Sequence, residues 1–283
     1  MDKKLTVAIP ASVISDTPHL REKTAKVGLI GRAAAIFRVK EIIVYPDNPR
    51  INQSRDIELI AALLAYMETP QYLRKRLFKL EPRLQFAGIL PPLRTPHHPL
   101  NRKPEDVKPG EYREGVVLSQ VKEGLLVDIG FEQPVLLREK QYAVGERLTL
   151  QIVKAGEQIE VQTVNRDEVA VYWGFVVSAE KRSFVKVVEN GRFDLTIATS
   201  KIGDAFADVA AKLSEKWRIA NSVFVGFGAP TRGLHEIAED EGVKLNDIVD
   251  FVVNTIPEQG TETVRTEEAL LASLAILNVC FGV

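Results

Sequence analysis

The sequence is poor in the residues that build disulfide frameworks and metal centres. Its 283 residues include one cysteine, Cys280, and four histidines that lie mostly far apart. A single cysteine excludes a disulfide within the chain, and no Cys/His spacing fits a zinc site. We therefore expect a protein without a structural metal, and the cysteine content favours the cytoplasm.

Long apolar runs and the common nucleotide-binding signatures are also missing. No stretch approaches the roughly 18–20 apolar residues of a membrane-spanning helix, and the one near the N-terminus is too short for a secretory signal. The glycines at 226–233 follow the spacing GxGxxxxG rather than GxGxxG, and no GK[ST] ends that loop. These absences argue against a membrane protein and against an NAD- or ATP-dependent enzyme on a Rossmann-type sheet.

The charge is nearly balanced overall but uneven along the chain. The net charge is −1, yet residues 71–103 contain eight basic residues against one acidic residue. Such a segment permits a phosphate-binding surface on a neutral protein, although a solvated helix face followed by a basic linker explains it equally well. The candidate RNA-binding residues in it are Arg74, Lys75, Arg76, Lys79 and Arg94.

Both ends of the chain alternate between strand and helix patterns. Residues 5–14 and 41–45 are apolar and rich in β-branched side chains, which predicts strands. Between them, Thr17 as a cap and Pro18 as the first helical residue predict the start of a helix. Further strands are expected at 194–198, 222–226 and 248–253, and helices at 207–217, 233–240 and 266–277. This alternation is typical of the α/β class with a parallel sheet.

The middle of the chain has a different character. Six prolines fall between Pro91 and Pro109, and short β-type runs separated by glycines follow them. These runs are 114–118, 125–129, 134–137, 147–153, 159–164 and 169–173. About five short strands in some 80 residues favour a small all-β barrel of the OB type. We predict an inserted barrel domain at 93–175 within a split α/β domain formed by 1–92 and 176–283.

Three segments after the C-terminal strands are candidates for ligand binding. In open parallel sheets, ligands bind beyond the carboxyl ends of the strands. The segments are 199–203, 226–233 and 254–266. The third has little apolar content although it connects a buried strand with an apolar helix, and such loops are often functional.

Four stretches of the sequence resemble one known family. They are VGLIGRAAAIFRVKEIIVY (27–45), QFAGILPPLRTPHHP (85–99), GFGAPTRGLHEI (226–237) and NTIPEQGTETVRTEEALLASLAILN (254–278). These stretches are similar to SPOUT-class RNA methyltransferases, and in particular to the archaeal and eukaryotic rRNA uridine-N3 methyltransferases that carry an OB-fold insert. The resemblance touches both halves of the split domain and the entry into the insert.

The resemblance implies a fold, a cofactor and an assembly. In that class the three C-terminal loops form a trefoil knot that holds S-adenosylmethionine, and the protein is a homodimer through the knot and the last helix. The contacts implied for the cofactor are Thr199, Gly226, Phe227, Gly228, Gly233, Asn254, Thr255, Ile256, Pro257, Gly260, Val264, Thr266 and Ala269. The expected substrate is RNA, with uridine N3 of rRNA as the methylated atom.

The chemistry of that reaction suggests which side chains to look for. N3 lies on the Watson–Crick edge, so the base must be unpaired, and its proton must leave. A cation near the ring would stabilise the resulting negative charge. The candidates are Arg32, Arg38 and Arg265 as cations, with Glu267 or Glu268 as proton acceptor. The arginines are equally explained as solvated or paired, and the glutamates as residues that favour a helix N-terminus.

A protein that binds RNA without catalysis is the alternative. In that interpretation the inserted barrel binds RNA and the α/β domain dimerises. The segments at 226–233 and 254–266 argue against it, because a protein that only binds RNA does not need a pocket for a cofactor. The insert also lacks the clustered aromatic residues of a base-stacking surface.

Overall fold

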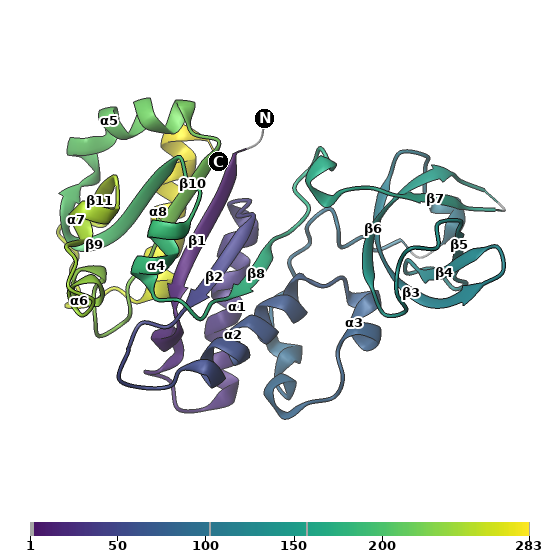
Figure 1. Ribbon diagram of the computed structural model, residues 1–283, viewed down its shortest axis with the longest axis horizontal. Coiled ribbons are helices and arrows are strands. Elements are labelled where there is room, and N and C mark those ends of the chain that lie inside the picture. Colours follow the sequence, from purple (N-terminus) through teal and green to yellow (C-terminus); the bar gives the residue numbers. More distant parts are fainter. Residues whose placement is uncertain (1–2, 102, 157, 283) are drawn as a thin grey trace. The chain divides into compact units, whose positions relative to one another are not determined.

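The chain forms two compact units. The computed structural model describes residues 3–101, 103–156 and 158–282, and its secondary structure is drawn in Figure 1. The first unit comprises Met1–Met67, Pro82–Pro92 and Phe175–Val283, and the second comprises Glu68–Glu81 and Leu93–Gly174. The second unit therefore contains a segment, 68–81, that precedes the proline-rich stretch.

A six-stranded parallel sheet is the centre of the first unit. Its strand order is β11-β9-β10-β1-β2-β8. The strands are β1 (Lys4–Pro10), β2 (Glu41–Tyr45), β8 (Val176–Ala179), β9 (Leu195–Ala205), β10 (Ser222–Gly226) and β11 (Phe251–Asn254). Every pair of neighbouring strands runs parallel, which confirms the predicted α/β class. The central strands are buried on both faces, as their continuous apolar runs require.

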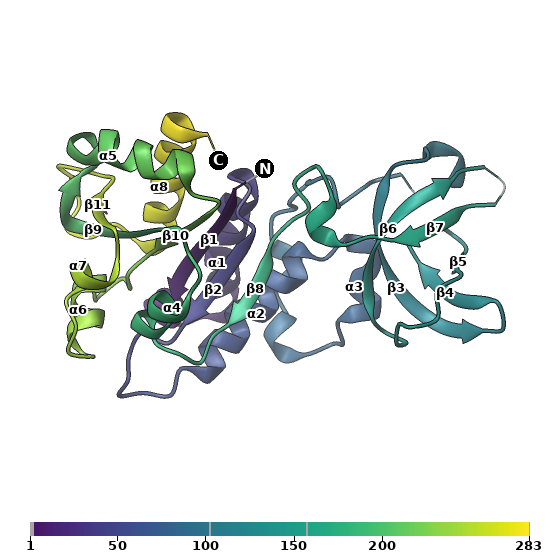
Figure 2. The same ribbon diagram turned by 45° about the horizontal axis from the view of Figure 1, so that its top comes forward.

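Helices cover the two faces of this sheet. On one side α1 (Leu20–Ile36) contacts α8 (Thr266–Phe281), which contacts α5 (Phe206–Ile219). On the other side α4 (Phe184–Asn190), α6 (Leu234–Glu239) and α7 (Leu245–Ile248) share one apolar core with the strands. Figure 2 shows α4, α6 and α7 below β9 and β10, with α5 and α8 above. A further helix, α2 (Ser54–Glu68), follows β2.

Aromatic packing dominates the core beneath α4. The ring of Phe224 on β10 lies 6.0 Å from that of Phe184 and 4.8 Å from that of Phe193, measured between ring centroids. Tyr45 on β2 also packs on Phe184. Tilted aromatic pairs at such distances stabilise a core beyond the area that they bury. This packing fixes the sheet on which the candidate site is built.

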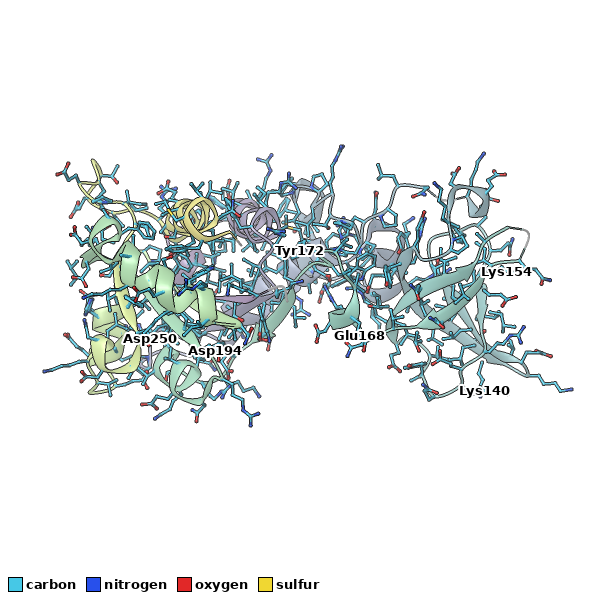
Figure 3. All side chains as sticks on the ribbon, turned by 90° about the horizontal axis from the view of Figure 1, so that it is seen from above. Lys140, Lys154, Glu168, Tyr172, Asp194 and Asp250 are labelled. Carbon is cyan, nitrogen blue, oxygen red and sulfur yellow. The ribbon has the colours of Figure 1, made fainter. Side chains whose placement is uncertain are left out.

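Two aspartates join neighbouring strands at their N-terminal ends (Figure 3). Asp194, before β9, accepts hydrogen bonds from the backbone N–H groups of Asn221 and Ser222 at 2.8 and 2.9 Å. Asp250, before β11, accepts from the backbone N–H and the hydroxyl of Thr196 on β9, at 2.8 and 2.9 Å. These bonds join β11, β9 and β10 at their N-terminal ends, opposite the carboxyl ends at which the candidate site lies.

The structure corrects several predicted element boundaries. The first strand ends at Pro10, and a short 3-10 helix occupies Ala11–Ile14. The first helix begins at Leu20 with His19 at its cap, and not at Thr17-Pro18. The hydroxyl of Thr17 instead donates to the carboxylate of Asp16.

The second unit contains a nearly closed antiparallel sheet. Its strand order is β5-β4-β3-β6-β7, and the edge strands β5 and β7 also contact each other. The strands are β3 (Tyr112–Val121), β4 (Gly124–Asp128), β5 (Val135–Leu137), β6 (Arg147–Lys154) and β7 (Glu160–Thr163). Five of the predicted β-type runs are therefore strands. The sixth, 169–173, is not a strand.

A buried network of charged groups ties residues 68–81 to this sheet. Glu68 is 4% exposed, and its carboxylate accepts from Arg147 at 2.7 Å and from Arg166 at 2.6 Å. Glu114 on β3 is 1% exposed, and it accepts from Arg147 at 2.5 Å and from the indole of Trp173 at 2.5 Å. Although burial opposes ionisation, the Arg147 guanidinium holds the pKa of Glu68 well below its usual range.

Candidate active site

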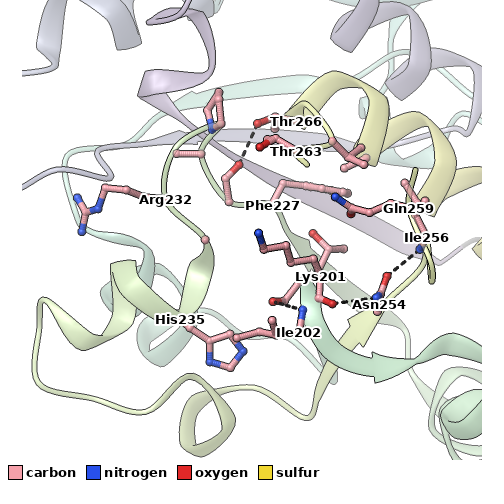
Figure 4. Close-up of a pocket in the computed structure, with 18 of the residues that line it drawn as sticks. Lys201, Ile202, Phe227, Arg232, His235, Asn254, Ile256, Gln259, Thr263 and Thr266 are labelled. Carbon is pink, nitrogen blue, oxygen red and sulfur yellow. Dashed lines mark hydrogen bonds between the residues drawn. The ribbon is translucent and has the colours of Figure 1, made fainter. Parts of the chain in front are cut away.

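The first unit contains a cavity of about 510 Å³ at the carboxyl ends of β9, β10 and β11 (Figure 4). Three chain segments line it, within 199–202, 227–236 and 253–269. The volume lies within the roughly 300–1,000 Å³ range of small-molecule sites. The position agrees with the expectation for parallel α/β sheets, in which ligands bind beyond the strand ends.

The first segment is part of strand β9, which corrects its prediction as a loop. β9 runs without interruption from Leu195 to Ala205. Its pairing with β11 jumps from Ala198 opposite Val252 to Asp204 opposite Val253. Residues 199–203 are therefore left without partners on β11 and bulge over the cavity.

Gly203 permits a close approach of two backbones at the end of this bulge. A Cβ atom placed on Gly203 would lie 2.7 Å from the carbonyl oxygen of Val252 and 2.9 Å from the nitrogen of Val253. Both atoms belong to the main chain of β11, so neither can turn aside. Only glycine fits there without a displacement of β9 or β11.

Hydrogen bonds join the three segments to one another. The side-chain amide of Asn254 donates to the carbonyl of Lys201 at 2.9 Å. The hydroxyl of Thr266 donates to the carbonyl of Gly228 at 2.9 Å, and that of Thr199 to the carbonyl of Gly226 at 3.0 Å. Each bond connects segments that lie far apart in the sequence. The wall of the cavity is therefore held in place by side chains that also line it.

Most of the residues expected to contact a cofactor line this one cavity. They are Thr199, Phe227, Gly228, Gly233, Asn254, Thr255, Ile256, Val264, Thr266 and Ala269. Three lie outside its lining. Gly226 accepts the hydrogen bond from Thr199, whereas Pro257 and Gly260 are exposed on the segment after β11.

Other lining residues were not singled out from the sequence. They include Lys201, Ile202, Arg232 and Gln259. All of them belong to the three segments or follow them directly, so position after the strand ends is the signal that could have found them. Sequence alone does not tell which side chains of a segment turn toward the cavity.

The candidate catalytic residues do not line the cavity of their own chain. Arg32 donates to the carbonyl of Pro92 at 3.2 Å. Arg38 follows α1 with a left-handed backbone, φ 53°. Arg265 is exposed at the cap of α8, where its N–H donates to the carboxylate of Glu268 at 2.9 Å. Glu268 therefore serves as a helix cap.

Glu267 faces away from the cavity toward α1. Its carboxylate is 8% exposed and lies 3.5 Å from the ammonium of Lys26, which also pairs with Asp16 at 2.7 Å. Burial raises the pKa of Glu267 above its usual value. Glu267 is not among the described residues that line the cavity.

The candidate RNA-binding residues all belong to the second unit. Arg74, Lys75 and Arg76 lie on α3 (Gln71–Leu77), with Lys79 just after it, and Lys75, Arg76 and Lys79 are exposed. The guanidinium of Arg74 donates to the carbonyl of Thr69, and that of Arg76 to Asp128 at 3.3 Å. Arg94 is exposed with a positive φ of 52°.

Comparison with known proteins identifies the family. A family model described as "Putative RNA methyltransferase" matches residues 4–277. The chain belongs to this RNA methyltransferase family. It is therefore an enzyme that transfers methyl groups to RNA, and the cavity is the candidate site of that transfer.

The sequences of individual relatives align with nearly the whole of this chain. It is 34% identical to the 28S rRNA (uridine-N(3))-methyltransferase of Mus musculus, over 96% of this chain and 75% of the mouse protein. It is 33% identical to the Homo sapiens protein of the same name, over 96% of this chain and 77% of the human one. A Halobacterium salinarum protein is 33% identical, over 97% of this chain and 98% of its own length.

No helix within 3–101, 103–156 and 158–282 is both long and apolar enough to cross a membrane. No group of three or more His, Cys, Asp or Glu side chains in the same ranges could hold a metal ion.

Proposed function

We propose that this methyltransferase uses S-adenosylmethionine bound in the cavity to methylate N3 of a uridine in large-subunit rRNA. The observation that carries the proposal is the convergence of three separate segments on one cavity at the strand ends. The names of the mouse and human relatives support uridine N3 of rRNA as the target. S-adenosylmethionine supplies an activated methyl group on a positively charged sulfur.

The residues present fit this cofactor. Ile256, Val264 and Ala269 offer apolar surface for an adenine ring, and hydroxyl and backbone groups lie beside them. Gly228 lies so close to the chain that a Cβ atom would be 3.1 Å from the nitrogen of Leu234 and 3.2 Å from the carbonyl of Arg232. Glycine at this position lets the loop 228–234 fold tightly back on itself in the cavity wall.

The proposal includes the knot and the dimer of the SPOUT class. The knot would be formed by the three segments that Asn254, Thr199 and Thr266 already join. The dimer would cover exposed apolar side chains of α1 and α8, among them Leu29 and Val279, which are 59% and 83% exposed. Exposed apolar residues on adjacent helices favour such an interface.

RNA binding is assigned to the second unit. A five-stranded antiparallel sheet whose edges meet has the form of a partly open barrel of the OB type, a fold that binds oligonucleotides. The exposed basic residues Lys75, Arg76 and Lys79 of the same unit would contact phosphates. The target base must be unpaired, because N3 is otherwise occupied by the Watson–Crick partner.

Calorimetric titration with S-adenosylmethionine tests the cavity. We expect micromolar affinity at one site per chain, with NADH and ATP giving no heat of binding. Gly228→Trp would displace the loop that forms the cavity wall and abolish binding. Gly88→Trp is the matched control, because nothing lies within 4 Å of the Cβ position at Gly88 and this exposed residue does not line the cavity.

Methyl transfer tests the substrate. The enzyme, unmethylated large-subunit rRNA transcript and S-adenosylmethionine with a radioactive methyl group are incubated, and the RNA is digested to nucleosides. We expect the radioactivity in 3-methyluridine. Label in another nucleoside would refute the N3 assignment. Binding of RNA without any cofactor binding would instead support the non-catalytic alternative.

A further inference from the structure

The cavity has two strongly basic side chains among its described lining residues, and one of them is already bound to other groups of the protein. The guanidinium of Arg232 donates to the carboxylate of Asp240 and, at 3.2 Å, to the carbonyl of Asp47. Figure 4 shows Arg232 pointing away from the middle of the cavity. Arg232 is therefore held by the protein and not available to a bound base.

Lys201 is the other cation. It lies on the bulge of β9, where the amide of Asn254 holds its carbonyl at 2.9 Å and the close approach at Gly203 limits backbone movement. Figure 4 shows its side chain reaching into the cavity. No ion pair of Lys201 occurs among residues 3–101, 103–156 and 158–282. Lys201 is exposed, its backbone is held in place, and its ammonium group has no carboxylate partner among these residues, so it is available to an anionic ligand group.

We propose that Lys201 is a catalytic residue that stabilises the negative charge of the uracil ring when N3 loses its proton. This inference rests on the proposed function, since only a base that ionises needs such a group. The arginines expected from the sequence to do this, Arg32, Arg38 and Arg265, do not line the cavity of their own chain. Lys201 does, and it lies on the part of β9 that is unpaired with β11 and borders the cavity.

The step balances without a change in the charge of Lys201. The N3–H bond breaks, its proton passes to solvent, and its electron pair remains on the ring, where the ammonium group of Lys201 stabilises it. The N3 pair then forms the bond to the methyl carbon. The bond between that carbon and sulfur breaks, and its electron pair stays on sulfur, which becomes a neutral thioether.

Other titratable groups line the same cavity and must be considered in any pH profile. His235 and Glu236 come from α6, and Glu262 comes from the segment after β11. The carboxylate of Glu236 already accepts the N–H of Gly233 at 3.1 Å. A variant that changes only Lys201 leaves these groups in place, so a difference between the two pH profiles reports on Lys201.

The test compares Lys201→Met and Lys201→Arg with Lys212→Met, a change of an exposed lysine on α5 that is outside the cavity. Single-turnover methylation of the rRNA transcript is followed against pH, and S-adenosylmethionine affinity is measured by calorimetry. We expect Lys201→Met to be slower by about 100- to 1,000-fold at neutral pH, with unchanged cofactor affinity. Lys201→Arg should restore part of the rate, and Lys212→Met should behave as the wild type.

A transcript made with 5-fluorouridine gives the decisive readout, because fluorine at C5 makes the N3 proton more acidic. If Lys201 stabilises the ring anion, the methylation rate of Lys201→Met comes closer to that of the wild type on this RNA and at high pH. If the variant is slower than the wild type by the same factor on both RNAs and also binds the cofactor more weakly, the proposal is overturned. Lys201 would then bind the carboxylate of the cofactor. If the variant is slower by the same factor on both RNAs and binds RNA more weakly, the proposal is likewise overturned, and Lys201 would bind an RNA phosphate.

The same measurements separate this inference from the proposed function. If the wild-type enzyme forms no 3-methyluridine, both the proposed function and the role of Lys201 are refuted. If the wild-type enzyme forms 3-methyluridine and Lys201→Met forms it equally fast, only the role of Lys201 is refuted.

Discussion

Substitution of Gly203 by alanine tests the close contact between β9 and β11 at the cavity. The new Cβ atom would lie 2.7 Å from the carbonyl oxygen of Val252, 2.8 Å from its carbonyl carbon and 2.9 Å from the nitrogen of Val253. All three are main-chain atoms, so the strands themselves must separate. Overpacking of this kind costs about 1–3 kcal/mol. A loss of about 2 kcal/mol lowers the folded-to-unfolded ratio roughly 30-fold.

Urea unfolding of Gly203→Ala gives the free energy of unfolding, and calorimetry gives the affinity for S-adenosylmethionine. We expect both to fall, because Thr199 and Lys201 lie on the same bulge and line the cavity. Gly260→Ala is the matched control: nothing lies within 4 Å of its Cβ position, and its stability should change by no more than about 0.5 kcal/mol. If Gly203→Ala were as stable as the control and bound the cofactor equally well, the contact would not be as close as described.

Three other changes test the rest of the structure. Glu68→Gln removes one of the two buried carboxylates that pair with Arg147 and the carboxylate that pairs with Arg166, so the free energy of unfolding in urea should fall by about 3–5 kcal/mol; a loss below about 1 kcal/mol would contradict the buried network. Burial lowers the pKa of His98 to about 4, so the folded state disfavours the protonated form. The unfolded chain then binds more protons below about pH 6.5, and stability should fall by up to about 3 kcal/mol as the pH drops from 6.5 toward 4. His98→Gln should flatten this dependence, measured by tryptophan fluorescence in urea, and an unchanged slope would assign it to other groups. Asp250→Ala removes both acceptors of Thr196, so calorimetric unfolding should show a loss of about 1–3 kcal/mol, whereas an unchanged melting temperature would mean that water replaces them.

The sequence predicts those elements whose limits are set locally. The strands at 41–45 and 222–226 have the predicted bounds, because each is a short apolar run closed by turn-forming or polar residues. The helix from Thr266 also begins where its pattern indicates, although it continues to Phe281. Periodicity and composition carry this information directly.

The sequence does not predict elements whose limits depend on contacts with residues far away along the chain. The polar residues 199–203 have the composition of a loop, yet they continue β9, because pairing with β11 resumes at Asp204. Residues 68–81 read as part of the α/β pattern, but they belong to the second unit, in which Glu68 is bound by Arg147 and Arg166. Neither contact leaves a signal in the local sequence.

The candidate site shows the same limit. The three segments and most of the residues expected to contact the cofactor lie together at one cavity. The expected catalytic arginines do not line it, because charge and proximity in sequence say nothing about side-chain direction. Lys201 was part of a recognised segment, but only the bulge of β9 turns it into the cavity.

The division of the chain has a consequence for synthesis on the ribosome. The polypeptide passes from one unit to the other after residues 67, 81, 92 and 174. The whole second unit has been made once residue 174 leaves the ribosome, whereas β1 still lacks β10, its partner at 222–226. We therefore expect the second unit to fold first during translation, while one edge of β1 remains unpaired, and accessible to chaperones or to wrong partners, until β10 has emerged.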